Sequence, residues 1–289
     1  MNDVRSIRLH YGVRAILLLT FALYIGYLVQ QGTLHYYVAP KLARWVRLCP
    51  VPLVLMSVSL AVQVLFGSNS NICDCGHKLP RSGFRIAALY SLFLFPLLLG
   101  FLLPDRALDS IAAARKGIAF TFTSYEGRPG VTLESSSPND QEYAELARIL
   151  YKQPVINVYP ELYAEIFGAI DRYKSNFAGK EIIVTGFLYP DVTGRSAENF
   201  AVSRFLVQCC TADATPLGII VDPGTQISLP TDTWIEVRGK LQIARHNDQQ
   251  IMQIAADSVI PVPQPSTPYI YTHSDSIAAW IELQELNAR

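Results

Sequence analysis

Three apolar segments occupy the first third of the chain. They cover about residues 13–31, 48–66 and 86–103, and the second and third contain no charged residue. About twenty consecutive apolar residues cross the hydrocarbon core of a bilayer, so the pattern predicts three transmembrane helices within a membrane anchor over residues 1–103. A cleaved signal peptide is the alternative interpretation of the first segment, although no small-residue cleavage site follows it.

Helical periodicity continues in the region after the third apolar segment. Apolar residues recur at every third or fourth position within 105–117, 141–152 and 160–173. This spacing predicts three short amphipathic helices, the first of them ending at Gly117. Residues 104–178 are therefore expected to form a helical linker region.

From residue 179 the helical pattern gives way to short, extended segments. Strands are predicted at 180–188, 200–210, 218–221, 234–243 and 250–260. Gly239 lies inside the fourth strand, as is typical of a bulge or a bend in a barrel. Five short strands in sequence predict an OB-like small β-barrel over residues 179–263, with a β-sandwich as the alternative.

The last segment, residues 264–289, is predicted to be a proline-rich linker followed by an amphipathic helix. Ser274 or Asp275 is expected to cap this helix. Its apolar face is expected to comprise Ile277, Trp280, Ile281 and Leu286. The predicted fold class is thus a membrane α anchor of three transmembrane helices joined to an α+β soluble domain.

The charges of the chain are divided between the two halves. The net charge is zero, but residues 1–103 hold nine Lys/Arg against two Asp/Glu, and residues 104–289 hold fifteen against twenty-two. Only 17% of residues are charged, against roughly 25% in a typical soluble domain, which fits a chain with a membrane part. Because phosphate binding needs a basic face, the acidic half argues against a nucleic-acid partner.

The orientation in the membrane follows from the first helix. Six Lys/Arg flank the predicted spans on each side, so the positive-inside rule gives a tie. The first helix usually dominates, which favours an internal N-terminus. We therefore expect a multi-pass protein of the cell (inner) membrane with an extracytoplasmic C-terminal domain.

Two adjacent cysteines, Cys209 and Cys210, precede Asp213 by a few residues. Adjacent cysteines make a poor disulfide because the small ring strains the bridge geometry. Thiolates select soft cations, so the three residues are candidate ligands for zinc or another soft divalent or monovalent metal. Core packing beside a turn is one alternative. A redox thiol whose pKa is lowered by Arg204 is another.

A second candidate metal site combines Cys73, Cys75 and His77. Two thiols and an imidazole within five residues could supply three of the four ligands that zinc prefers. A polar loop between two helices is the alternative. The sequence contains no serine elbow, no phosphate-cradling glycine loop and no paired carboxylates placed for hydrolysis, so a non-catalytic protein is expected.

Several of these segments together resemble the YcgQ-like family of two-component membrane permease complex subunits. The segment Leu103–Gly117 is similar to the stretch that follows the last span in that family, and Cys75-Gly76-His77 is similar to its loop between spans. Arg204-Phe205 together with Cys209–Pro216 resembles the signature of the family's C-terminal domain. The similarity extends over about residues 10–271.

The resemblance implies a non-catalytic accessory subunit that works in the lipid bilayer beside a larger polytopic permease subunit. It also favours binding or sensing of a metal ion or another small solute at Cys209, Cys210 and Asp213. The loop after His77 is often histidine-rich in the family but here continues Lys78-Leu79-Pro80-Arg81, which argues against a high-capacity metal site. A membrane-tethered thiol oxidoreductase and a purely scaffolding module remain the alternatives.

Overall fold

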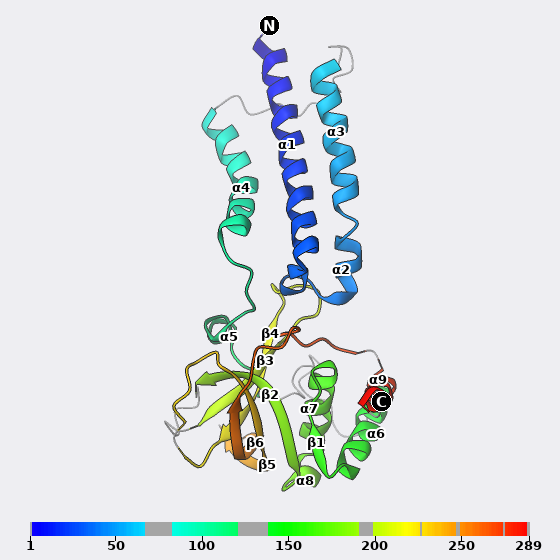
Figure 1. Ribbon diagram of the computed structural model, residues 1–289, viewed down its shortest axis with the longest axis vertical. Coiled ribbons are helices and arrows are strands. Elements are labelled where there is room, and N and C mark those ends of the chain that lie inside the picture. Colours follow the sequence, from blue (N-terminus) through cyan, green and yellow to red (C-terminus); the bar gives the residue numbers. More distant parts are fainter. Residues whose placement is uncertain are drawn as a thin grey trace. The chain divides into compact units, whose positions relative to one another are not determined.

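The computed structural model describes residues 2–66, 83–120, 138–190, 199–225, 227–246, 249–273 and 275–287. The chain divides into two compact units, Met1–Arg106 and Ala107–Arg289 (Figure 1). The candidate ligands Cys73, Cys75 and His77 lie outside the described residues.

The first unit is helical. Its elements are α1 (Asn2–Gln31), a 3-10 turn (Thr33–Tyr36), α2 (Pro40–Val46), α3 (Pro50–Phe66) and α4 (Gly83–Leu102). Among the residues that the structure describes, three stretches are long and apolar enough to cross a membrane, namely Arg8–Gln31, Pro40–Phe66 and Phe84–Leu102. The three predicted apolar helices are therefore confirmed as helices.

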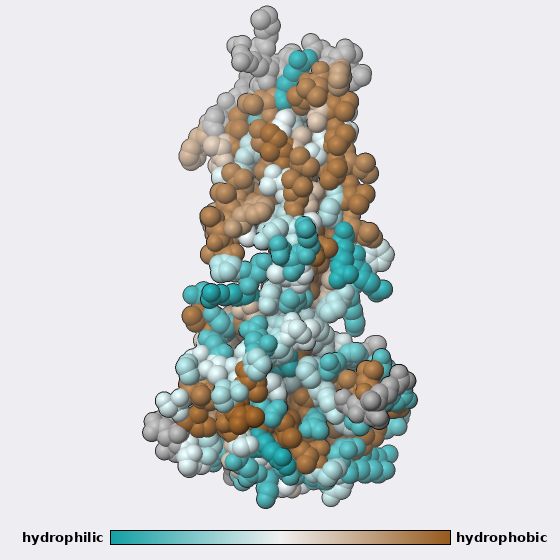
Figure 2. Space-filling view, viewed as in Figure 1, coloured by the Kyte–Doolittle hydropathy of each residue, from teal (hydrophilic) through white to brown (hydrophobic). Residues whose placement is uncertain are grey.

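Most apolar side chains of these helices face outward. Of the most apolar windows, 17% of the first and 6% of each of the others is buried. Figure 2 shows the resulting hydrophobic cover over α1, α3 and α4. Two buried polar side chains are paired between helices: Ser57 donates to the carbonyl of Ala15 at 2.7 Å, and His10 lies 2.8 Å from the hydroxyl of Tyr90. Such pairing suits an apolar surrounding, where an unpaired polar group is costly.

The second unit contains a sheet and several short helices. Its helical elements are α5 (Ser110–Lys116), α6 (Pro138–Lys152), a 3-10 turn (Pro160–Leu162), α7 (Tyr163–Arg172), α8 (Lys174–Phe177) and α9 (Ser276–Asn287). Its strands are β1 (Val155–Asn157), β2 (Glu181–Pro190), β3 (Phe200–Leu206), β4 (Thr215–Asp222), β5 (Trp234–His246) and β6 (Gln249–Pro261).

Of the six strands in the described part of the chain, five close into a barrel. The strand order is β1-β2-β3-β4-β6-β5, and β5 pairs back onto β2. The β2–β5 ladder is antiparallel and runs from Glu181 opposite Lys240 to Phe187 opposite Trp234. All pairings among β2–β6 are antiparallel except β4–β6, which is parallel. This closure excludes the β-sandwich alternative.

One predicted strand was too long. The pattern predicted extended chain as far as Cys210, but β3 ends at Leu206. The physical reason is local, because the backbone amides of residues 208–210 donate to the side chain of Asp213 instead of to a neighbouring strand. A short polar side chain can compete in this way with a sheet ladder.

The apolar faces of α6 and α7 are buried in the core of this unit, as expected of amphipathic helices. Leu146 and Leu150 of α6 are fully buried, as are Ile166 and Ile170 of α7. The single helix predicted at 160–173 instead begins with a 3-10 turn at Pro160. The short strand β1, which pairs in parallel with β2, was not predicted.

The apolar face predicted for the C-terminal helix is half wrong. Asp275 caps the helix as expected, accepting from the amide of Ala278 at 2.9 Å. Trp280 is buried and lies edge-on to Tyr159, but Ile281 and Leu286 are 53% and 59% exposed. Leu283 packs on the core in their place, because the buried face follows a spacing of three residues from Ile277.

Gly239 is required where β5 bends. The ladder between β5 and β6 shifts register between Arg238 and Gly239. A Cβ atom at Gly239 would overlap the backbone carbonyl of Ala255 on β6, and backbone atoms cannot give way as a flexible side chain can. The closed barrel therefore depends on a residue without a side chain at this position.

We expect Gly239→Ala to lower the free energy of unfolding of the second unit by roughly 3 kcal/mol, since an added methyl group overpacks two bonded strands. Thermal or urea denaturation followed by circular dichroism measures this loss. Lys240→Ala is the matched control at the exposed neighbouring position and should change stability by less than about 0.5 kcal/mol. Equal effects of the two substitutions would contradict the role given to the bulge.

Candidate functional site

The turn between β3 and β4 carries the predicted thiol site, and the carboxylate of Asp213 organises it. One oxygen of Asp213 accepts from the amide of Gln208 at 3.0 Å. The other accepts from the amides of Cys209 at 2.8 Å and Cys210 at 3.3 Å. The amide of Asp213 donates in return to the carbonyl of Cys210 at 3.0 Å. The turn is thus closed around a single side chain.

This turn brings the two thiols together at the surface. The Sγ atoms of Cys209 and Cys210 are 3.7 Å apart, far beyond the 2.0 Å of a disulfide, and both thiols are free. Cys209 is exposed and Cys210 is half-buried. The ligand atoms of Cys209, Cys210 and Asp213 all lie within 4.8 Å of one another. Three of the predicted site residues therefore converge, and the geometry is one that a metal ion could occupy.

The electrostatics of the turn favour the protonated form of the Cys209 thiol. The hydrogen bond to Asp213, followed by the one to Cys210, raises the pKa of the Cys209 thiol to about 11. Burial alone would raise the pKa of Asp213, but the hydrogen bonds from the Cys209 thiol and the three amides together hold it below its ordinary value. An activated redox thiol needs the opposite shift, towards a lower pKa.

Lys116 at the end of α5 holds the same turn from outside. Its Nζ donates to the carbonyls of Ala214 at 2.8 Å, Ala212 at 2.9 Å and Thr211 at 3.4 Å. The chain just after α5 also pairs with β4, where the amide of Ala119 donates to the carbonyl of Pro216. The sequence predicted a helix here but gave no signal of this contact, because the partners lie 95 to 98 residues apart.

The opposite end of α5 is fixed as well. Asp109 caps the helix by accepting from the amide of Ala112 at 3.0 Å. The amide and hydroxyl of Ser110 both donate to the carboxylate of Asp232, at 2.6 and 2.9 Å. Because both ends of this seven-residue helix are tied to the barrel, Lys116 is presented to the turn in a defined position.

Arg204 is not part of the thiol cluster. Its guanidinium is buried and donates to the carbonyls of Thr267 at 2.6 Å and Pro268 at 3.3 Å, over the ring of Trp234. Burial lowers its pKa, which the nearby Tyr163, Glu161 and Tyr271 partly oppose. The guanidinium is not among the groups that shift the pKa of Cys209. Its predicted activation of a thiol therefore finds no support, and its contacts instead fasten the proline-rich segment to the barrel.

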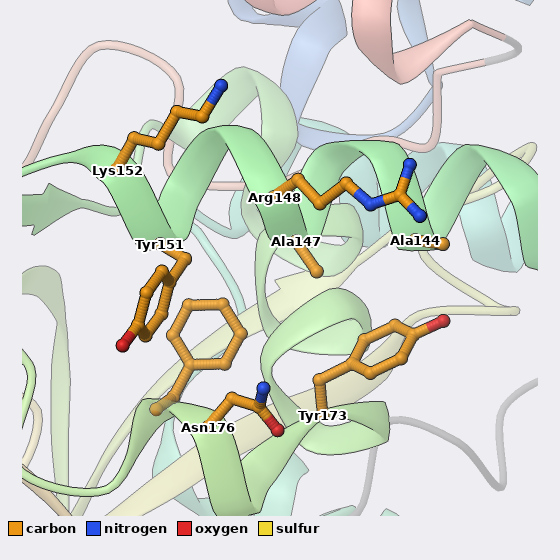
Figure 3. A pocket seen from close by; sticks show the side chains of 8 residues that line it. Ala144, Ala147, Arg148, Tyr151, Lys152, Tyr173 and Asn176 are labelled. Atoms are coloured by element: carbon orange, nitrogen blue, oxygen red, sulfur yellow. The ribbon is translucent and has the colours of Figure 1, made fainter.

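A separate open groove of about 390 Å³ is lined by α6 and by residues 173–177 (Figure 3). Ala147 and Phe177 line its apolar part, while Tyr151, Tyr173 and Asn176 surround it. The residues that line the groove include no cysteine, histidine or carboxylate. It therefore shares nothing with the thiol turn, and sequence reasoning had not predicted it.

Comparison with known proteins identifies relatives of both halves of the chain. The DUF1980 N-terminal domain matches residues 13–119, and the DUF1980 C-terminal domain matches residues 133–272. A protein of Streptococcus mutans that carries the provisional name of a two-component membrane permease complex subunit is 25% identical over 195 residues, covering 61% of this chain and 70% of that protein. The UPF0703 protein YcgQ of Bacillus subtilis is 24% identical over 196 residues, covering 63% and 68%.

The thiol turn and the segment that holds Lys116 both fall inside the matched regions. The matched domains cover the apolar helices and the barrel in the order in which the chain presents them. The chain therefore belongs to the DUF1980 family, the same YcgQ-like family that its motifs resemble.

Proposed function

We propose that this protein is a non-catalytic accessory subunit of a membrane permease complex. Its three apolar helices would cross the membrane, and its barrel domain would bind a small solute or metal ion for the complex. The observation that carries the solute-binding role is the exposed turn in which Asp213 holds the thiols of Cys209 and Cys210 3.7 Å apart. The name given to the relative in Streptococcus mutans supports the permease partnership.

The membrane part of the proposal rests on the outward-facing apolar side chains of the first unit. In water such a surface would lead to aggregation, whereas a lipid bilayer covers it without cost. Three crossings would make the protein multi-pass and, with an internal N-terminus, would put the barrel domain outside the cytoplasm. The partner would then be a larger polytopic subunit that supplies the transport path.

The barrel part of the proposal concerns its OB-like type. In chain order the five barrel strands pair as first, second, third, fifth, fourth and back to first, with the single parallel pair between the third and the fifth. This order supports an OB-like barrel, a fold whose ligands bind at its loops and at an exposed strand face. The thiol turn connects its second and third strands.

The permease partnership is tested by affinity purification of the tagged full-length chain from native membranes. We expect a polytopic transporter subunit to co-purify, and the Cys209→Ser/Cys210→Ser variant to retain this partner because its substitutions lie at a surface turn. The same variant should lower solute transport at least about tenfold if the turn binds what is carried.

An unrelated three-span protein with the same tag is the control for that purification. Repeated absence of any polytopic transporter would reject the partnership. Retained partner together with unchanged transport in the cysteine variant would favour the purely scaffolding module instead.

The alternative, a thiol oxidoreductase, is tested by the reactivity of Cys209. A rise of its pKa from 9.0 to about 11 lowers the thiolate fraction near neutral pH about a hundredfold, and the greater nucleophilicity of a more basic thiolate restores about tenfold. We therefore expect alkylation of Cys209 to be about tenfold slower than that of free cysteine, and to accelerate as the pH rises towards 11.

Rates resolved for each cysteine by mass spectrometry measure this. Asp213→Asn removes the largest cause of the shift, so Cys209 should react faster in that variant. A Cys209 that reacts faster than free cysteine at neutral pH would instead support the oxidoreductase.

A further inference from the structure

We propose that the β3–β4 turn is a tetrahedral site for a zinc-class divalent cation, with the Sγ atoms of Cys209 and Cys210 and one carboxylate oxygen of Asp213 as ligands and a fourth position open. The inference rests on the proposed solute-binding role of the barrel domain and names the chemical class of the solute. Zinc is the reference ion because it takes mixed sulfur and oxygen ligands in this geometry.

The separation of the two thiols favours tetrahedral coordination. Two sulfurs bound to zinc at 2.3 Å with a tetrahedral angle lie about 3.8 Å apart, whereas a linear pair would lie about 4.6 Å apart. The observed separation is 3.7 Å. The ion could therefore bind between the thiols with almost no movement of the backbone. Hard cations such as magnesium or calcium are disfavoured, because they select oxygen ligands only.

Asp213 can add an oxygen ligand without giving up the turn. A carboxylate has about four acceptor positions, and amides of the turn occupy three of them. The Cys209 thiol also hydrogen-bonds to this carboxylate. When the ion binds, each thiol loses its proton to water and a sulfur–metal bond replaces the S–H bond. The position that held the thiol proton is then open to the ion, and a side-chain movement of about 1 Å completes the contact.

The site is shaped before the ion arrives. Three backbone amides donate hydrogen bonds to Asp213, and three backbone carbonyls accept from Lys116. These hydrogen bonds fix the backbone on both sides of the thiols. The entropic cost of ordering the ligands is therefore met by folding and not by ion binding, as in other preorganised sites. Because Cys209 is exposed, the fourth position faces solvent or a group from another chain. Structural zinc sites are closed by four protein ligands, so this one is suited to exchange its ion.

Zinc binding is measured by titration against a chromophoric chelator. The reference is the full-length chain in detergent that carries Cys73→Ser/Cys75→Ser, which removes the other candidate thiol ligands. We expect about one equivalent of zinc per chain, and none after Cys209→Ser/Cys210→Ser is added. Cobalt bound in place of zinc should show the charge-transfer absorption of thiolate ligands and the intense visible bands of a tetrahedral ion. Cys49→Ser, at another exposed thiol, is the matched control and should leave binding unchanged.

The proposal is overturned if the reference chain binds no zinc, or if zinc remains after both turn cysteines are replaced. An unchanged melting temperature of the Cys209→Ser/Cys210→Ser chain shows that the loss does not come from unfolding. Co-purification of a transporter is scored on the same preparations. A metal-free turn in a chain that still holds its transporter rejects the zinc site alone, whereas bound zinc without a transporter rejects the subunit role alone.

Lys116 is a positioning residue for this site, since it touches the backbone of the turn and neither thiol. Lys116→Met keeps the length of the side chain but removes three hydrogen bonds, so zinc affinity should fall about tenfold with the stoichiometry unchanged. Lys180→Met is the control, because Lys180 also donates to a backbone carbonyl, that of Gln153 at 3.1 Å, but far along the chain from the turn. Equal affinities in the two variants would show that Lys116 only supports the fold.

Discussion

The antiparallel ladder between β2 and β5 is the constraint on which the second unit depends. It joins the first and the fourth strand of the barrel. Each of the five strands therefore has a neighbour on both sides, and the sheet has no open edge. Closure requires β5 to bend, and Gly239 permits the bend because a side chain would meet the backbone of β6. Once the barrel is closed, the ends of β3 and β4 are fixed, and so is the span that their connecting turn must bridge.

Within that fixed span, the shape of the turn is set by hydrogen bonds rather than by packing. Cys209 is exposed, so burial contributes little to its position. Asp213 instead accepts hydrogen bonds from the amides of three consecutive residues just after the strand ends. The carboxylate thereby satisfies the backbone and directs two side chains towards one point. The hydrogen bond of the Cys209 thiol to Asp213, followed by the one to Cys210, raises the pKa of this thiol, which argues against redox chemistry and makes binding of a thiolate-seeking ion weaken as the pH falls.

The sequence predicted those features that local periodicity encodes. The three apolar helices, the barrel strands, the bend at Gly239 and the buried faces of α6 and α7 all follow from residue spacing. The end of β3 did not, because an apolar run continues through Val207 while the competition from Asp213 comes from six residues further on. The strand β1, the face of α9 and the contact of Lys116 with the thiol turn depend on tertiary packing, which a single sequence does not display. The residue types alone identified Cys209, Cys210 and Asp213 as candidate ligands, but their convergence depends on the end of β3 at Leu206, which the apolar pattern did not predict.

The residues of the motif that links Arg204 with the two cysteines have two different physical roles. Arg204 is buried and donates to carbonyls of the segment that follows β6, while its neighbour Phe205 accepts from the amide of Ile270 at 2.9 Å and stacks on Phe187. These contacts hold the end of the chain against the barrel, and burying a cation for that purpose is worthwhile only when its donors are satisfied. The cysteines and Asp213 lie just beyond, where the strand has ended and side chains reach solvent. The residues of the motif up to Leu206, where β3 ends, therefore stabilise the fold, whereas the residues after it form the candidate site.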